Sequence, residues 1–264
     1  MSKHYNTFLN GLPDRTEKPR ANGVTMVMDK GISLRQAEDF VNTSAQFVDF
    51  IKLGFGTSVI SNNLKEQVAL YRNAGMKVYV GGTLFEAFVI RNQFNDYLKF
   101  ITELGLDCAE VSDGSIELAH DQKCEYISKL SKKFTVLSEV GSKEEGVIIH
   151  PARWIKMMHN ELEAGAGKVI AEARESGTVG IFHKNGSAHS MLINRIVNKI
   201  KLENIIWETP QKSQQVYFLK MFGSNVNLGN IAIDDVIPLE TLRLGLRGDT
   251  FFSFLPETLD KSLQ

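Results

Sequence analysis

Charged residues directly follow a hydrophobic run near the middle of this sequence. Residues 169–171 have the apolar pattern of a buried β-strand, and Glu172 and Arg174 come immediately after them. Charged groups at such depth are costly unless they pair with one another or hold a metal ion. The segment therefore allows two interpretations: an ion pair that closes a buried strand, or part of a polar site.

The same arrangement recurs at other hydrophobic runs, which favours the polar site. Glu110, Glu139 and Glu208 each lie near the end of such a run, and Lys52 lies near the end of another. Carboxylate oxygens are ligands that Mg²⁺ prefers in proteins, so the glutamates indicate a hard-cation site. Some of them could instead pair with lysines or with Arg174. The sequence has no H-E-x-x-H or C-x-x-C motif, which argues against zinc.

An asparagine- and glycine-containing segment near the end of the sequence indicates an anion site. The stretch "NVNLGNI" (225–231) holds Asn227, Gly229 and Asn230, which would let the backbone approach a phosphate group. Loops after the seventh and eighth strands of many barrels bind phosphate on exposed backbone N–H groups. The alternative is a tight turn that needs glycine for its backbone angles.

Short strands and helices in alternation must position these residues. Helical patterns separate eight β-rich runs; we expect helices to begin at Ser33 and at Ser115, and another to cover 233–246. The alternation predicts parallel pairing and a single (β/α)8 TIM barrel of the α/β class, with one domain over 1–264 and a short N-terminal extension over about 1–20. The predicted strands are 24–29, 49–55, 77–82, 108–114, 134–141, 168–176, 204–210 and 225–231.

A closed barrel would bring the candidate residues together. The carboxyl ends of all its strands meet at one face, and barrel enzymes keep their active sites there. An open doubly wound sheet is the alternative, but it would need a G-x-G-x-x-G loop after an early strand. The stretch "GFGTS" at 54–58 lacks that spacing.

The composition narrows the class of partner. A net charge of −1 provides no basic field for nucleic acid. No run of about 18 apolar residues is present, so we expect no membrane span. The first residues lack the apolar core of a signal peptide. These features predict a cytoplasmic protein whose partners are small-molecule substrates.

Several long motifs together resemble those of the phosphosulfolactate synthase family. They extend from about Lys18 to Thr250, nearly the whole chain. The motifs are "KPRANGVTMVMDKG", "VDFIKLGFGTS", "GGTLFE", "EVSDGSIEL", "SEVGSK", "EAGAGKVIAEARESG", "VNLGNI" and "LETLRLGLRGDT".

The resemblance implies a (β/α)8 barrel that adds sulfite to phosphoenolpyruvate with the help of Mg²⁺. The product would be (2R)-2-O-phospho-3-sulfolactate, a precursor of coenzyme M in methanogens and of sulfolactate in some bacteria. The resemblance also allows a homo-oligomer. Negative charge would build up on the substrate carboxylate during the addition, and a cation with fixed donors would stabilise it.

Roles for individual residues follow from the resemblance as hypotheses. Lys143 matches the second lysine of the family's loop after the fifth strand and is the candidate proton donor, whereas Ser142 replaces the first lysine. Lys52 and Arg174 would hold the substrate carboxylate or the incoming sulfite. The expected ligands of Mg²⁺ are Glu110, Glu139 and Glu172. The expected substrate- and phosphate-binding residues are Lys30, Asn227, Gly229 and Asn230.

Two other functions compete with this one. The family includes plant heat-stress-associated relatives, so the chain could be a barrel that binds or scaffolds without catalysis. It could also be a barrel lyase or aldolase that acts on another phosphorylated enol or carbonyl acid. A Schiff-base aldolase would need a buried lysine with a lowered pKa, and Lys52 is the strand lysine placed for that role.

Overall fold

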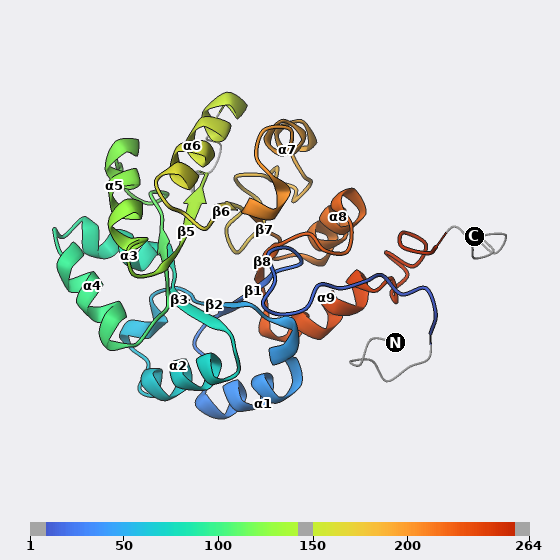
Figure 1. Ribbon diagram of the computed structural model, residues 1–264, viewed down its shortest axis with the longest axis horizontal. Coiled ribbons are helices and arrows are strands. Elements are labelled where there is room, and N and C mark those ends of the chain that lie inside the picture. Colours follow the sequence, from blue (N-terminus) through green and yellow to red (C-terminus); the bar gives the residue numbers. More distant parts are fainter. Residues whose placement is uncertain (1–8, 142–149, 257–264) are drawn as a thin grey trace.

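The protein folds as a ring of parallel strands enclosed by helices, as its computed structural model shows for residues 9–141 and 150–256 (Figure 1). Eight strands occur within these residues, one at each predicted β-rich run, so the predicted (β/α)8 barrel is confirmed. The strands are β1 (Thr25–Asp29), β2 (Phe50–Leu53), β3 (Lys77–Val80), β4 (Cys108–Val111), β5 (Thr135–Val140), β6 (Lys168–Ala171), β7 (Ile205–Glu208) and β8 (Leu228–Ile231).

Helices follow the strands and pack around the outside of the ring (Figure 1). The α-helices are α1 (Leu34–Ser44), α2 (Leu64–Asn73), α3 (Gly82–Val89), α4 (Phe94–Glu103), α5 (His120–Leu130), α6 (Pro151–Glu163), α7 (Ser190–Val197), α8 (Lys212–Phe222) and α9 (Val236–Arg243). Short 3₁₀ turns are η1 (Ala45–Phe47), η2 (Thr57–Val59), η3 (Leu202–Asn204) and η4 (Ile233–Asp235). No helix in the described ranges is long and apolar enough to cross a membrane.

The ring is hydrogen-bonded everywhere except at one boundary. The strand order is β3-β2-β1-β8-β7-β6-β5-β4, with parallel pairing throughout. β3 and β4 end this order and lie against each other, but within the described residues no ladder of main-chain hydrogen bonds joins them. We call this boundary the β3–β4 seam.

Alternation along the strands divides the apolar side chains into two groups. In β1, Met26 points into the ring, whereas Val27 packs outward beneath the helices. The outward group forms the large core between strands and helices. The inner group fills the barrel below its carboxyl-terminal mouth with Val24, Met26, Phe50, Tyr79, Cys108, Leu137, Ile170 and Ile206.

Two predicted helix starts have different outcomes. Ser33 is the N-cap of α1, where its side chain and that of Gln36 form a capping box, so this prediction is confirmed. The prediction that a helix begins at Ser115 is wrong, because α5 begins at His120. The backbone N–H of Ser115 is instead bound by the side chain of Glu86.

Two predicted strands are too long. β6 ends at Ala171 rather than at residue 176, because Arg174 adopts a left-handed conformation with φ of 57°. β8 begins at Leu228 rather than at residue 225. Both differences matter for the site, since they change which residues lie at the mouth.

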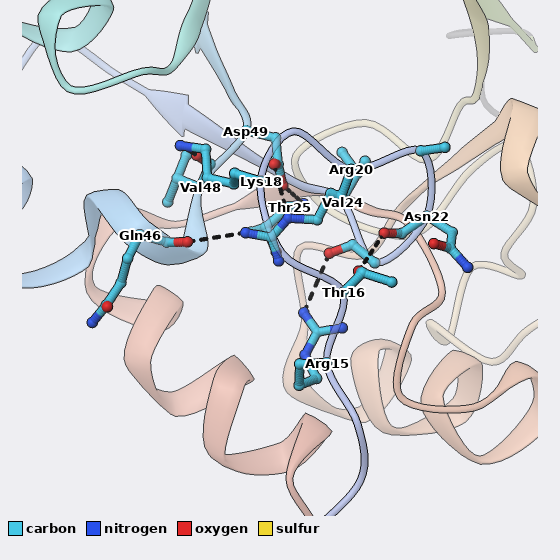
Figure 2. Close-up of polar contacts among 12 residues, drawn as sticks. Arg15, Thr16, Lys18, Arg20, Asn22, Val24, Thr25, Gln46, Val48 and Asp49 are labelled. Atoms are coloured by element: carbon cyan, nitrogen blue, oxygen red, sulfur yellow. Dashed lines mark hydrogen bonds and ion pairs between the residues drawn. The ribbon is translucent and has the colours of Figure 1, made fainter. Parts of the chain in front are cut away.

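The segment before β1 is tied to the end of the barrel opposite the mouth (Figure 2). Lys18 donates to the carbonyl oxygen of Val48 at 2.5 Å. Arg20 forms an ion pair with Asp49 at 3.0 Å, and Arg15 forms one with Glu240 at 2.8 Å. Part of the segment predicted as an N-terminal extension thus contacts the amino-terminal face of the barrel.

Candidate active site

A buried lysine lies at the centre of the mouth. Lys52, near the end of β2, is only 7% exposed. Its Nζ lies 3.1 Å from Oε1 of Glu110, 3.4 Å from Oε1 of Glu208 and 3.5 Å from Oε2 of Glu139. These three glutamates come from β4, β7 and β5, so the lysine joins side chains from across the ring.

The charges in this cluster shift one another's pKa values. Burial lowers the pKa of Lys52, but the carboxylates of Glu110, Glu208 and Glu139 together raise it well above its ordinary value. Burial raises the pKa of Glu208 to about 7, against the lowering effect of Lys52. Lys52 is therefore an ammonium ion at neutral pH, whereas Glu208 exchanges its proton in the physiological range.

Three glutamates at the mouth form a group that could hold a metal ion. One carboxylate oxygen each from Glu139, Glu172 and Glu208 lies within 4.8 Å of the others, and all three residues are buried. Oxygen-only donors with several negative charges suit Mg²⁺, so the residues fit the predicted ion. This group contains Glu208 where the sequence prediction had Glu110. Glu110 instead contacts Lys52 and accepts a hydrogen bond from the backbone of Gly82 at 2.6 Å.

Glu172 occupies its place because the chain leaves the strand just before it. Its Oε1 accepts a hydrogen bond from the backbone N–H of Arg174 at 2.5 Å. Neighbouring glycines make room for it: a Cβ at Gly141 would lie 2.4 Å from Cβ of Glu172, and one at Gly180 would lie 1.9 Å from its carbonyl oxygen. Glu172 and Arg174 therefore lie beyond the end of β6 rather than within the strand.

Two of the predicted substrate-binding cations lie at the rim of the mouth. Arg174 is exposed. Lys30 pairs with Glu175, where the two side chains are 44% and 50% exposed, and its Nζ lies 5.7 Å from the centre of the Phe55 ring. The Lys30–Glu175 pair links the loops that follow β1 and β6. Both cations stay predictions as substrate ligands.

The three residues of the predicted phosphate site lie at different levels of the barrel. Asn227 precedes β8 at the amino-terminal face, where its amide binds the backbones of Val24, Glu203 and Ile205; its predicted place at the mouth is wrong. Gly229 faces the barrel interior, where a Cβ would lie 2.6 Å from Cε of Met26, so packing explains this glycine.

Asn230 remains a candidate for the substrate site. It is buried, it lies near the carboxyl-terminal end of β8, and its φ of 55° is unusual for a residue other than glycine. Within the described part of the chain its side-chain oxygen has no hydrogen-bond partner. Lys143, the predicted proton donor, lies outside the described residues.

Ser112 and Glu86 were not among the predicted site residues, yet both lie at the mouth. The Ser112 hydroxyl lies 2.8 Å from Oε1 of Glu139, and Glu86 of α3 contacts the same hydroxyl. One signal was available for Glu86: it is the only charged residue of α3, "GTLFEAFV", which is otherwise almost wholly apolar.

A parallel (β/α)8 barrel with a lysine and four glutamates buried at the carboxyl ends of its strands has the architecture of a barrel enzyme that acts on a small charged molecule. The chain belongs to the (2R)-phospho-3-sulfolactate synthase (ComA) family, which matches residues 13–249. The family predicted from the motifs is thereby confirmed.

Relatives cover almost the whole chain. It is 41% identical over 244 residues to the phosphosulfolactate synthase of Methanothermobacter thermautotrophicus, covering 90% of this chain and 95% of the relative. It is 39% identical over 250 residues to that of Bacillus subtilis, covering 94% and 99%. This similarity confirms the predicted function as a phosphosulfolactate synthase.

Solved structures support the fold. The 3-hexulose-6-phosphate synthase of Salmonella typhimurium superposes with a TM-score of 0.53 at 14% identity, covering 85% of this chain and all of that structure. At this identity the likeness concerns the barrel alone.

Proposed function

We propose that the barrel mouth adds sulfite to phosphoenolpyruvate and releases (2R)-2-O-phospho-3-sulfolactate, with Mg²⁺ held by Glu139, Glu172 and Glu208. A bond forms between the sulfite sulfur and C3 of the enol, and C2 takes up one proton. The observation that carries the proposal is the buried cluster around Lys52, in a chain similar to phosphosulfolactate synthases along nearly its whole length.

The charge balance of the mouth supports the metal ion. Among the described residues, three buried glutamates contact the ammonium group of Lys52, and a fourth, Glu172, lies beside Glu139 and Glu208. Phosphoenolpyruvate and sulfite are both anions, and such a cluster would repel them unless a cation compensated the carboxylates. When bound, Mg²⁺ would supply the positive charge that stabilises the developing negative charge on the substrate.

The chain's own residues would position the reactants and move the proton. Lys52, a permanent cation at neutral pH, is proposed to orient the substrate carboxylate from below the mouth. Lys30 and Arg174 are proposed to attract the anions at the rim, with Asn230 as a further polar contact. Lys143 is proposed to deliver the proton to C2, since its segment follows Gly141, which packs directly against Glu172.

The raised pKa of Lys52 separates this proposal from a Schiff-base aldolase. A Schiff base needs a neutral amine, and the carboxylates around Lys52 favour the charged form. We therefore expect no covalent adduct when the protein is treated with borohydride and a phosphorylated carbonyl acid.

The deciding experiment follows the loss of phosphoenolpyruvate in the presence of sulfite and Mg²⁺, with each omitted in turn. The proposal predicts loss only when all three are present, together with an organic sulfonate product detected by mass spectrometry. Loss without sulfite would indicate a different reaction. No loss from a folded protein would favour a barrel that binds without catalysing.

The role of Lys143 is tested by Lys143→Ala. Turnover should fall strongly, by about 10²–10⁴-fold, because a positioned acid contributes that much to proton transfer. Turnover like that of the wild type would remove Lys143 from the mechanism.

A further inference from the structure

Helix α3 carries a buried carboxylate that the proposed chemistry does not use. Glu86 is only 1% exposed, and its Oε1 and Oε2 accept hydrogen bonds from the backbone N–H groups of Gly114 at 3.1 Å and Ser115 at 2.9 Å. It also contacts the hydroxyl of Ser112. All three partners belong to the short segment that leads from β4 into the following loop.

The contacts of Glu86 continue into the mouth. The Ser112 hydroxyl lies within hydrogen-bonding distance of Glu86 on one side and 2.8 Å from Oε1 of Glu139 on the other. The second oxygen of Glu139, Oε2, faces Lys52 at 3.5 Å. Ser112 and Lys52 together therefore contact both oxygens of Glu139.

This chain of contacts crosses the β3–β4 seam. Glu86 belongs to the helix after β3, whereas Ser112 follows β4. A second link crosses the seam beside it, where Gly82 at the start of α3 donates its N–H to Glu110. A Cβ at Gly82 would lie 2.4 Å from Cβ of Ser112, so the glycine allows the helix to approach this closely. Where no strand ladder sets the register, the backbone N–H of Gly82 and the side chain of Glu86, both in α3, link the two halves of the mouth.

We infer that Glu86 and Ser112 are positioning residues: they orient Glu139 toward the carboxylates of Glu172 and Glu208 so that the three can hold a divalent cation. The inference rests on the proposed metal site. Hydrogen-bonding partners behind metal ligands set the orientation of those ligands. Their loss typically lowers metal affinity by about 10- to 100-fold.

The test measures Mn²⁺ binding by electron paramagnetic resonance in the wild type and in Ser112→Ala, Glu86→Gln and the double variant. We expect each single variant to bind Mn²⁺ about 10-fold more weakly. The double variant should be little weaker than either, because both substitutions break the same chain of contacts. The control is Ser58→Ala, which removes another buried serine hydroxyl, one with no hydrogen-bond partner in the described ranges.

Thermal unfolding followed by circular dichroism separates positioning from loss of the fold. The inference expects Glu86→Gln, which keeps the size of the side chain, to stay folded and still lose Mn²⁺ affinity. Unchanged affinity in a folded Glu86→Gln would overturn the role of Glu86. Unchanged affinity in Ser112→Ala would overturn the role of Ser112. Absence of Mn²⁺ binding by the wild type would instead remove the proposed metal site, and the inference with it.

Discussion

Lys52 is the cation on which the other buried charges of the mouth depend. Its contacts with Glu110, Glu139 and Glu208 place three carboxylates around one ammonium group in a volume with little access to water. Removing one partner of a buried ion pair is far more destabilising than the net contribution of the pair, because the remaining charge is left uncompensated.

Lys52→Met should therefore destabilise the metal-free protein by about 3–5 kcal/mol near pH 8. The loss should shrink as the pH falls, because protonated carboxyl groups no longer need the cation. Added Mg²⁺ should restore part of the stability. Urea unfolding at pH 8 and pH 5.5, with and without Mg²⁺, measures these changes in the free energy of unfolding. In the control Lys129→Met, which removes an exposed i,i+4 pair with Glu125, the change should stay within about 0.5 kcal/mol.

Glu208 should make the stability of the metal-free protein depend on pH. Its pKa rises from an ordinary value of 4.5 to about 7 in the fold. Between these values the native state holds a proton that the unfolded state has lost. The free energy of unfolding should thus fall as pH rises from 4.5 to about 7 and level off above, a change on the order of 3 kcal/mol.

The variant Glu208→Gln carries no titratable group at this position and should lack that part of the pH dependence. Unfolding curves in EDTA from pH 5 to pH 8 compare the two proteins. If the free energy of unfolding depends on pH in the same way in both proteins, the pKa of Glu208 in the fold is close to its ordinary value.

At the scale of single elements, helix α3 approaches the end of β4 closely at the mouth. The helix starts at Gly82, directly against Ser112 and Glu110. A methyl group at this position has no free volume to occupy, and overpacking of this kind costs about 1–3 kcal/mol.

Gly82→Ala should accordingly lower the free energy of unfolding by about that amount and weaken metal binding, since the helix must shift away from β4. Denaturant unfolding and Mn²⁺ titration measure both effects. Gly248→Ala is the matched control, because a Cβ at Gly248 would meet no atom within 4 Å. Equal unfolding free energies and equal Mn²⁺ affinities in the two variants would show that α3 can move without affecting the mouth.

For the whole molecule, the sequence predicted the architecture well because each strand has its own local signal. Eight hydrophobic runs separated by helical patterns define the barrel, and the rule that strand ends converge places Lys52 and the glutamates together. Strand ends were less predictable. Asn227 lies at the opposite face because β8 starts three residues later than expected, and a turn at Arg174 ends β6 early.

The parts of the site that were not predicted depend on contacts between different strands and helices of the barrel. The sequence alone does not tell whether Glu110 or Glu208 completes the carboxylate group with Glu139 and Glu172, because the strands' relative positions decide it. The pairing of Glu86 with Ser112 joins residues 26 positions apart in the chain, across two strands that share no ladder.

The β3–β4 seam has a consequence for how the barrel opens in solution. Separating any other pair of neighbouring strands breaks a ladder of main-chain hydrogen bonds, whereas between β3 and β4 the described residues show no such ladder and are linked by contacts to side chains. Transient opening of the ring should therefore begin there, and the backbone amides of β3 and β4 should exchange with deuterium sooner than those of β1 and β8. A substrate that contacts both sides of the mouth would slow this exchange, so part of its binding energy would go into closing the ring.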